Sequence, residues 1–511
     1  MNKVFLLALW FGFAVGPLGA QTPRPAEPTP VPPATLLSPE HSAVAAPATG
    51  GTLARLLLVG RPVVNQRLTL DEAVLIARRE SPVVRGAVAE VEAAAAQVAA
   101  ARAETRPMVS ANTFVSGGTL ANIVESPQLP VARMIMSLPR GAYADQNLMV
   151  MFPLYTGGRL AALVRQAAAQ RGASEANLRA QGDEVALLTR VAYRDVLLRQ
   201  ALVEVARTQL RENEERLRID RARLQQQQIP AYYVSRDEAE VAASQQAVAN
   251  AQRDALIAVS QLKTVLGVSL ASRLDLSASA LDYQPSKDLL VPLTGEAAGT
   301  TATGAVDPSL PADLVALLRR AEQQRPELQT ARQRIAAARA ESAAIQGGYR
   351  PQVNLFAMGD VARMGGERAS GGVTYGLAAS IPLYTGGGER ARVQGASAQR
   401  RQQEQEQERV ALQVAQEVNA AYLTLMAAEQ NIQTARTALT AAQEEYRAAR
   451  ARYDAGRSVL VEALDALASR VRAEVNVIQA SYEYNVAGDR LRRAVGGLDA
   501  ASGTVLPGAP R

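Results

Sequence analysis

Glu462 and Asp465 are two acidic residues three positions apart in the sequence, a spacing that lets them act as a pair. They follow a turn at Gly456, and residues three apart lie on the same face of a helix. Tyr453 and Arg457 stand just before them. Carboxylates that line a pore concentrate cations and repel anions. On an ordinary surface the same two residues only solubilise the start of a helix and complement its dipole, so both interpretations stand at this point.

Residues for enzymatic chemistry are missing. The single histidine, His41, lies in a segment rich in Pro, Ala and Thr, away from any partner for a Ser-His-Asp triad. Cysteine is absent, which excludes disulfides, thiol nucleophiles and Cys-based zinc sites. The phosphate-binding motif GxxxxGK does not occur. The nine methionines form no relay for soft metals. The glycines at 386–388 are better explained as a backbone hinge than as a phosphate cradle. We therefore predict no enzyme, no cofactor and no metal site.

The composition favours thin helices packed side by side. Only 4% of the 511 residues are aromatic while alanine is abundant, a balance that does not fit a bulky globular core. The net charge of +6 comes almost wholly from arginines that alternate with Glu and Gln. Because these arginines neither cluster with aromatic residues nor form a stripe of one sign, we expect solvated helix faces and no nucleic-acid binding.

One short phrase occurs twice, at residues 152–158 and 381–387, and shares Pro-Leu-Tyr-Thr-Gly-Gly. Before the second copy apolar residues alternate, as in a strand, and after it they recur every three or four residues, as in a long helix of a coiled coil. Each copy is therefore predicted to be a strand-to-helix joint, with the residues Pro153, Gly157, Gly158, Pro382, Gly386 and Gly387. Since Arg106-Pro107 also returns as Arg350-Pro351, the chain is two copies of one plan.

The expected segments are a signal peptide at 1–20, a Pro-rich disordered tether at 21–65, a first repeat at 66–267, a connector at 268–311, a second repeat at 312–497 and a disordered tail at 498–511. The first repeat is predicted to hold a helix over 69–105 that breaks at Pro82, strands near 107–117 and 144–153, and a helical hairpin of 156–225 and 232–266. The second is predicted to hold a helix over 312–346, strands near 351–361 and 373–383, and a hairpin whose helices end at 453 and 495. The fold class is mainly α with a small β part.

The predicted strands have the length that crosses an outer membrane when tilted, about ten residues. Val353 and Leu355 alternate with Gln352 and Asn354, so one face suits lipid and the other water. Four strands cannot close a barrel, and open edges are not tolerated in hydrocarbon. Two chains would give a barrel of about eight strands whose interior is filled by side chains. Three chains would give a barrel of about 12 strands with a lumen. The alternative is a soluble sheet beside a coiled coil.

This order of elements, repeated with its joint, resembles the TolC-type outer-membrane efflux proteins over about residues 66–497. The resemblance implies a homotrimer in which four strands from each chain form a 12-strand β-barrel in the outer membrane, joined to a 12-helix periplasmic α-barrel. It also implies that the tips of the second hairpins form a periplasmic aperture. Tyr453, Glu462 and Asp465 match the family's spacing there, whereas Arg457 stands one place earlier than the family's arginine. Asp237 is the counterpart of Asp465 in the first hairpin, where Arg236 and Glu238 accompany it and no acid stands at the position of Glu462.

The resemblance further implies partners: outer-membrane lipid, a periplasmic adaptor (membrane-fusion) protein and an inner-membrane pump, for which this chain would be the exit duct. Many members carry a lipidated N-terminal cysteine, and this sequence has none. Within the same class, an exit duct for type I protein secretion is an alternative. A periplasmic coiled-coil scaffold that never enters the membrane is the alternative from another class. The transported substrate is not encoded in any recognisable motif.

Overall fold

The computed structural model describes residues 65–118, 141–277, 311–364 and 368–497. The chain divides into two units, Met1–Arg55 and Leu56–Arg511, and every described residue belongs to the second. The predicted signal peptide and tail, nearly all of the tether and most of the connector lie outside the described residues. The segment boundaries that depend on them therefore stay predictions.

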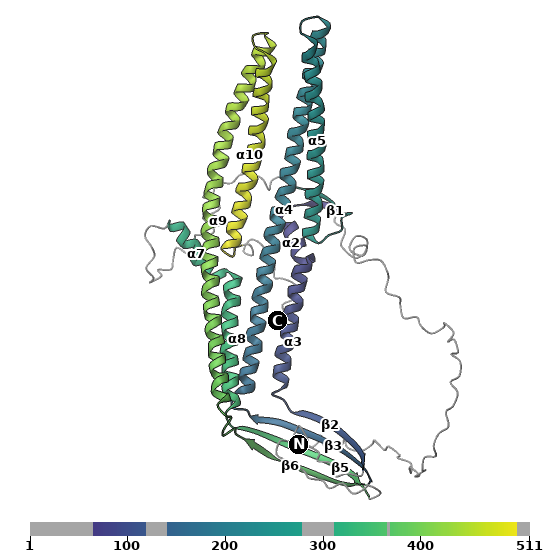
Figure 1. Ribbon diagram of the computed structural model, residues 1–511, viewed down its shortest axis with the longest axis vertical. Helices are drawn as coiled ribbons and strands as arrows, with labels where there is room; N and C mark the ends of the chain where they lie inside the picture. Colours follow the sequence, from purple (N-terminus) through teal and green to yellow (C-terminus); the bar gives the residue numbers. More distant parts are fainter. Residues whose placement is uncertain (1–64, 119–140, 278–310, 365–367, 498–511) are drawn as a thin grey trace, which may run out of the picture. The chain divides into compact units, whose positions relative to one another are not determined.

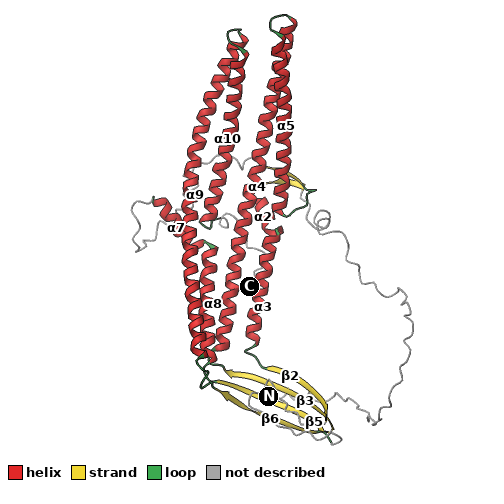
Figure 2. Ribbon diagram, in the orientation of Figure 1, coloured by secondary structure: helices red, strands yellow, loops and turns green. Residues whose placement is uncertain are grey.

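Helices make up most of the described chain, in the repeated order that the sequence predicts (Figures 1 and 2). The first repeat contains α2 (Leu70–Glu80), α3 (Pro82–Ala103), α4 (Arg159–Gln225) and α5 (Ala231–Leu266). The second contains α7 (Ala312–Gln324), α8 (Pro326–Gly348), α9 (Gly388–Asp454) and α10 (Leu460–Ala494). With 67 residues each, α4 and α9 are about 100 Å long at 1.5 Å per residue. The prediction of a mainly helical fold with a small β part is confirmed.

Both repeats break their short helix at a proline. The predicted break at Pro82 is confirmed, and Thr69 begins α2 with a capping box in which Thr69 and Glu72 satisfy each other's backbone N–H groups. The prediction of one continuous helix over 312–346 is wrong, because the chain becomes extended at Arg325 and restarts as α8 at Pro326. Proline lacks a backbone N–H and disfavours the α conformation of the residue before it, so Pro326 acts as Pro82 does.

A glycine at the end of α5 or α10 packs against each break. Gly267 has φ +72°, and a Cβ there would lie 2.8 Å from the carbonyl oxygen of Glu80. Gly496 has φ +77°, and a Cβ there would lie 3.0 Å from Gln324. Only glycine combines this left-handed conformation with so close an approach.

We expect Gly267→Ala to destabilise the protein by at least about 1–2 kcal/mol, since alanine is strained at positive φ and its Cβ would push against Glu80. The control is Gly86→Ala inside α3, where a Cβ meets nothing within 4 Å. That change should stabilise the protein by about 0.5–1 kcal/mol because alanine is the better helix former. Chemical unfolding midpoints measure both, and equal midpoints for the two variants would contradict the expectation.

Four antiparallel strands form one sheet in the order β2-β3-β5-β6. They are β2 (Met108–Gly118), β3 (Gly141–Tyr155), β5 (Gln352–Met364) and β6 (Ser370–Ser380). The central pair joins the two repeats, since Met151 pairs with Phe356 and Leu148 with Gly359. Strands β2 and β6 are the outer strands, and each has one edge with no partner within the described part of the chain.

The two copies of the joint differ in one respect. The first lies partly in β3, whose register shifts between Pro153 and Tyr155. The second follows β6, which ends at Ser380, so the prediction that the strand extends to residue 383 is wrong. In both copies the two glycines have positive φ, +63° and +84° in the first copy and +62° and +81° in the second, and the second glycine is the N-cap of the long helix.

A second, smaller sheet was not predicted. It pairs β1 (Asn65–Leu68) with β4 (Arg273–Leu276) in parallel. Tyr193 of α4 is fully buried against it and donates its hydroxyl proton to the carbonyl of Leu68 at 2.7 Å, while its oxygen accepts from the N–H of Ser277 at 2.8 Å. Burial raises the pKa of Tyr193, so the hydroxyl remains a donor. These bonds attach the start of the first repeat to its end.

Each repeat has an apolar core of its own. In the first repeat the fully buried side chains include Tyr193, Leu262 and Leu266, and in the second they include Leu317, Leu425 and Leu491. Helix α4 packs against α8 and α10 and so connects the repeats. The two largest apolar clusters therefore each lie within one repeat, while α4 carries the contact between the repeats.

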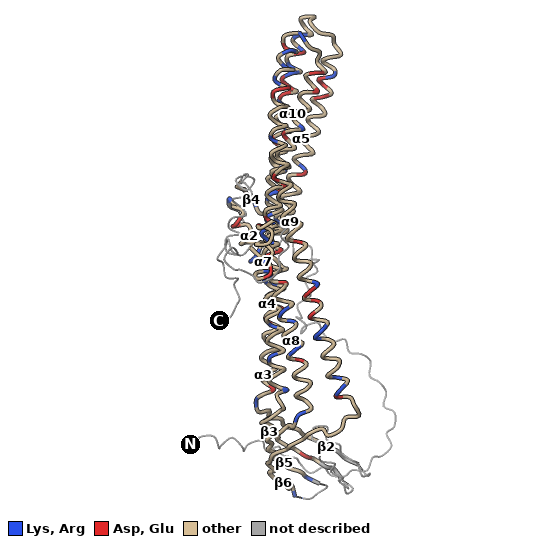
Figure 3. The backbone as a smooth tube through the Cα atoms, turned by 90° about the vertical axis from the view of Figure 1, so that its left-hand side faces the viewer, with Lys and Arg blue, Asp and Glu red and all other residues tan. Residues whose placement is uncertain are grey.

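Charged residues are distributed along the helices and are scarce in the four-stranded sheet (Figure 3). The strands of that sheet contain only Asp145, Asp360 and Arg363. On β6 the side chains of Val373, Tyr375 and Leu377 are 77%, 79% and 65% exposed. No helix in the described ranges combines the length and apolarity needed to cross a bilayer.

Candidate functional site

The two helical hairpins are in contact near their turns, through residues of α4 and α9. Tyr453, near the end of α9, donates its hydroxyl proton to Asp220 Oδ2 of α4 at 2.9 Å. Arg223 donates to Asp220 Oδ1 at 3.2 Å and lies with its guanidinium carbon 5.3 Å from the centre of the Tyr453 ring. Asp220 is fully buried. We call Tyr453, Asp220 and Arg223 the tip contact.

Electrostatics keep Tyr453 a donor. Burial and the hydrogen bond to Asp220 raise the pKa of its hydroxyl well above the ordinary value. Arg223 also lies 3.6 Å from Asp454, the last residue of α9, so the same arginine pairs with carboxylates on both hairpins. The tip contact therefore links the hairpins through one charge-assisted hydrogen bond and one bridging guanidinium.

A second buried carboxylate lies behind Asp220. Asp237 of α5 is fully buried and accepts from Arg216 Nε at 2.9 Å. The pKa of Asp237 is raised, chiefly by burial. In the sequence Glu240 stands three residues after Asp237, whereas Val234 stands three residues before it, at the position that corresponds to Glu462.

The predicted aperture residues lie near the tip contact but are not all joined to it. Tyr453 is part of it. Glu462, in the first turn of α10, accepts hydrogen bonds from Ser458 and from Arg452 of α9, and these two donors lower its pKa. Asp465 is exposed, and within the described residues it has no hydrogen bond or ion pair. The two carboxylates thus stand on one helix with different surroundings.

Within the described residues, Arg457 makes no ion pair with Glu462. Its side chain is exposed, and its backbone N–H donates to the carbonyl of Arg452 at 2.8 Å in the turn. Arg452 is the arginine that pairs with Glu462 across the second hairpin. Within one chain, Glu462 is therefore paired with an arginine of the opposite helix of its hairpin.

Farther from the turns, α4 and α10 are joined by further ion pairs, which we call the charged seam. Arg470 of α10 lies 2.9 Å from Glu212 of α4. Asp489, fully buried on α10, accepts from Arg194 at 2.9 Å and lies 3.7 Å from Arg190. Both arginines belong to α4 and are themselves buried.

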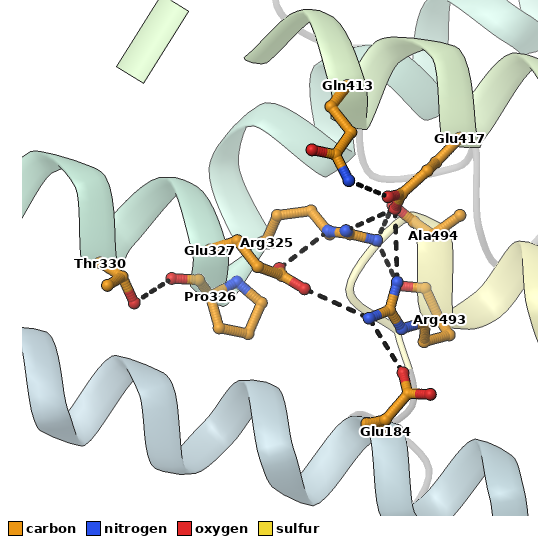
Figure 4. A network of polar contacts seen from close by, with 9 residues as sticks. All are labelled: Glu184, Arg325, Pro326, Glu327, Thr330, Gln413, Glu417, Arg493 and Ala494. Carbon is orange, nitrogen blue, oxygen red and sulfur yellow. Dashed lines mark hydrogen bonds and ion pairs between the residues drawn. The ribbon is translucent and has the colours of Figure 1, made fainter. Parts of the chain in front are cut away.

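The seam ends in a network at the break between α7 and α8 (Figure 4). Arg493 of α10 lies 3.0 Å from Glu184 of α4, 3.4 Å from Glu327 of α8 and 3.3 Å from Glu417 of α9. Arg325, whose side chain is 3% exposed, pairs with Glu417 at 2.7 Å and donates to the carbonyl of Ala494 at 3.3 Å. Two arginines thereby hold four helices together where α10 ends.

Sequence reasoning missed Asp220, which no local motif marks. A signal was present, because Asn213, Leu217 and Asp220 are spaced four and three apart on the buried side of α4. A carboxylate in an apolar helical stripe indicates a buried partner. The partner, Tyr453, lies 233 positions away and could not be assigned from sequence. Within the described part of the chain no group of three His, Asp or Glu side chains is arranged to hold a metal ion.

Comparison with known structures identifies the fold. Similar chains include the outer-membrane channel OprN, with 20% identity, a TM-score of 0.64 and coverage of 84% of this chain and 90% of that one. CusC has 18% identity, a TM-score of 0.67 and coverage of 86% and 96%. The open state of the MtrE outer-membrane channel of Neisseria gonorrhoeae has 19% identity, a TM-score of 0.63 and coverage of 84% and 89%.

The sequence itself matches one family description. A search of curated proteins returns no match. The profile of the family described as "Outer membrane efflux protein" matches residues 75–268 and 317–497, one stretch in each repeat. Together these stretches cover more than half of the chain, and the chain belongs to the outer membrane efflux protein family.

Proposed function

We propose that this protein is a trimeric outer-membrane exit duct. The observation that carries the proposal is the four-stranded sheet with free outer edges on β2 and β6 within the described residues. Its exposed face on β6 is apolar at Val373, Tyr375 and Leu377. Unpaired strand edges in a bilayer are costly unless a barrel closes, and three copies supply about 12 strands around a lumen. The matching long helices would form a 12-helix barrel in the periplasm.

The same proposal assigns the partners. The sheet contacts outer-membrane lipid, and the hairpin turns at the far end of α4 and α9 dock to a periplasmic adaptor and an inner-membrane pump. The sequence has no GxxxxGK phosphate-binding loop to couple transport to a nucleotide. The pump therefore supplies the energy and selects the cargo. Membership of the outer membrane efflux protein family supports this assignment, and a role in catalysis is not proposed.

In this duct the hairpin turns form the closed periplasmic aperture. The tip contact holds the second hairpin against the first, while Glu462 and Asp465 of three chains form two acidic rings near Arg457. Opening separates the hairpins and breaks the Tyr453 bond. A docked partner favours opening only to the extent that it binds the separated arrangement more tightly.

Detergent extraction and bilayer recording test the proposal. The full chain is expected to leave membranes only with detergent, to run as an oligomer that heat converts to monomer, and to form discrete channels in planar bilayers. A folded protein that is extracted without detergent and never conducts would instead be the periplasmic scaffold, and the duct would be rejected.

The acidic rings give the duct a preference for cations, because fixed negative charge concentrates cations and repels anions. We expect the double change Glu462→Gln and Asp465→Asn to reduce the ratio of cation to anion permeability severalfold, measured from reversal potentials under a salt gradient. The matched control, Glu204→Gln with Glu444→Gln, removes two exposed carboxylates that pair with arginines on their own helices. Equal selectivity in both doubles would exclude the aperture role.

A further inference from the structure

A cavity of about 400 Å³ lies beside the first strand-to-helix joint. Its walls come from the start of α4, the end of α8 and the start of α9, and its volume is within the range of small-molecule sites. Arg159 is the first residue of α4, and Tyr349 follows α8 three residues before β5 begins at Gln352. The cavity is therefore placed where the helices meet the four-stranded sheet.

Close backbone contacts hold Arg159 at the edge of this cavity. A Cβ on Gly347 would lie 2.7 Å from the backbone nitrogen of Arg159, so glycine is needed for the end of α8 to approach the joint this closely. The Cδ of Arg159 lies 3.7 Å from the place that a Cβ would take on Gly348. The side chain of Arg159 thus runs along the end of α8, beside the residue that precedes Tyr349.

Two buried donors in the cavity have no acceptor within the described residues. They are the Nε–H of Arg159 and the hydroxyl of Tyr349. A buried donor without an acceptor loses its hydration and gains no bond in return, so such groups usually have a partner. Arg392 of α9 also lines the cavity, is exposed, and forms no ion pair within the described part of the chain. Two arginines and a hydroxyl together favour an anion as that partner.

The rest of the lining narrows the kind of anion. Leu163 and Ile345 give the cavity an apolar wall, and Glu341 is the one acidic residue among those that line it. A small inorganic anion would contact the donors and leave the apolar wall uncovered. A phosphate ester that also carries an amine suits the whole lining, because its carbon chain covers the wall and its ammonium group pairs with Glu341.

We propose that this cavity binds the amine-bearing phosphate headgroup of a phospholipid. Arg159, Tyr349 and Arg392 donate to the phosphate oxygens, and Glu341 accepts from the ammonium group. The place of the cavity favours a lipid, because in the proposed duct the sheet lies in the bilayer and the joint lies at the level of the headgroups. That placement rests on the proposed function, whereas the chemistry of the cavity does not.

The first test is native mass spectrometry of the full-length protein in detergent with added phosphatidylethanolamine. The wild-type protein is expected to retain the lipid, whereas Arg159→Gln with Arg392→Gln should weaken retention by at least about tenfold. The matched control is Arg165→Gln with Arg390→Gln, which neutralises two exposed arginines of the same helices that do not line the cavity. Equal retention by the two doubles overturns the proposal.

Two conservative variants keep the proposal testable if the arginine double fails to fold. Tyr349→Phe removes only the buried hydroxyl and should weaken retention about tenfold. Retention equal to that of the wild type would mean that this hydroxyl bonds to water, and would overturn its role. Glu341→Gln should shift the preference toward phosphatidylglycerol, which has the phosphate but no amine. An unchanged preference overturns the assignment of the amine.

Glycerophosphoethanolamine, the same headgroup without acyl chains, identifies the source of the ligand. Retention of the lipid with at least about tenfold weaker binding of the soluble headgroup is expected, because the acyl chains add apolar contact. Equal affinity for both would make a soluble phosphate ester the occupant and overturn the lipid. Retention in detergent needs no channel activity, so a protein that binds the lipid and never conducts keeps the site and rejects the duct.

Discussion

Replacing Asp489 with alanine is expected to destabilise the protein by about 3–5 kcal/mol, the cost of breaking a buried ion pair by removing one partner. Asp489 has 0% exposure and receives the Nε–H of Arg194 at 2.9 Å. Arg190, on α4 like Arg194, lies 3.7 Å from Asp489, and Arg492 of α10 lies 3.4 Å from it. Without the carboxylate, three guanidinium groups remain close together with their shared negative charge removed.

The measurement is the chemical unfolding midpoint at fixed protein and detergent concentrations. Asp254→Ala is the control, because within the described residues Asp254 pairs with no group but its exposed neighbour Arg253, and surface changes of this kind stay within about 0.5 kcal/mol. Asp489→Asn separates charge from shape and should recover only part of the loss. A midpoint for Asp489→Ala equal to that of Asp254→Ala would show that the buried pair contributes nothing to stability.

Tyr453→Phe is expected to open the duct. It removes the hydroxyl that donates to Asp220 at 2.9 Å while keeping the ring beside Arg223. A hydrogen bond to a charged group contributes about 1.5–3 kcal/mol, so each chain should shift its ratio of open to closed hairpins by roughly 10- to 100-fold. Bilayer recordings should show larger conductance or longer open times than in the wild-type protein.

Tyr232→Phe is the matched control for that change. Tyr232 stands at the start of α5, is 64% exposed, and has its ring centre 4.5 Å from that of its neighbour Tyr233. Because the Tyr232 hydroxyl makes no hydrogen bond to the second hairpin within the described residues, its loss should leave conductance unchanged. If Tyr453→Phe conducts like Tyr232→Phe, the tip contact does not control the aperture.

The order of elements could be predicted because hydrophobic periodicity and the repeat are local signals. The long helices end where the turn residues indicate, and Pro82 marked its break correctly. The second break was missed although its signal was present: Ser81-Pro82 and Arg325-Pro326 are separated by the same interval as Arg106-Pro107 and Arg350-Pro351. Arginine is a good helix former, and only the proline after it indicates that the helix stops.

The site was predictable only in part. Tyr453 and Glu462 lie on either side of one turn in the sequence, and the turn residues between them indicated this site. Asp220 and Asp237 have their partners on other helices, so the spacing of residues within one helix cannot predict these contacts. The same reason explains β1 and β4, because a strand of four residues carries too little alternation to be recognised without its distant partner.

The charged seam also fixes how far α10 can slide along α4. From Glu184 through Arg190 and Arg194 to Glu212, the charges on α4 are negative, positive and negative. The partners on α10, Arg493, Asp489 and Arg470, are positive, negative and positive. Alanine-rich helices can pack in several axial positions, but an axial shift would separate these ion pairs, and because the charges are unevenly spaced no other position would restore all of them. The ion pairs therefore act as a register between the two repeats, with only one alignment that satisfies all of them.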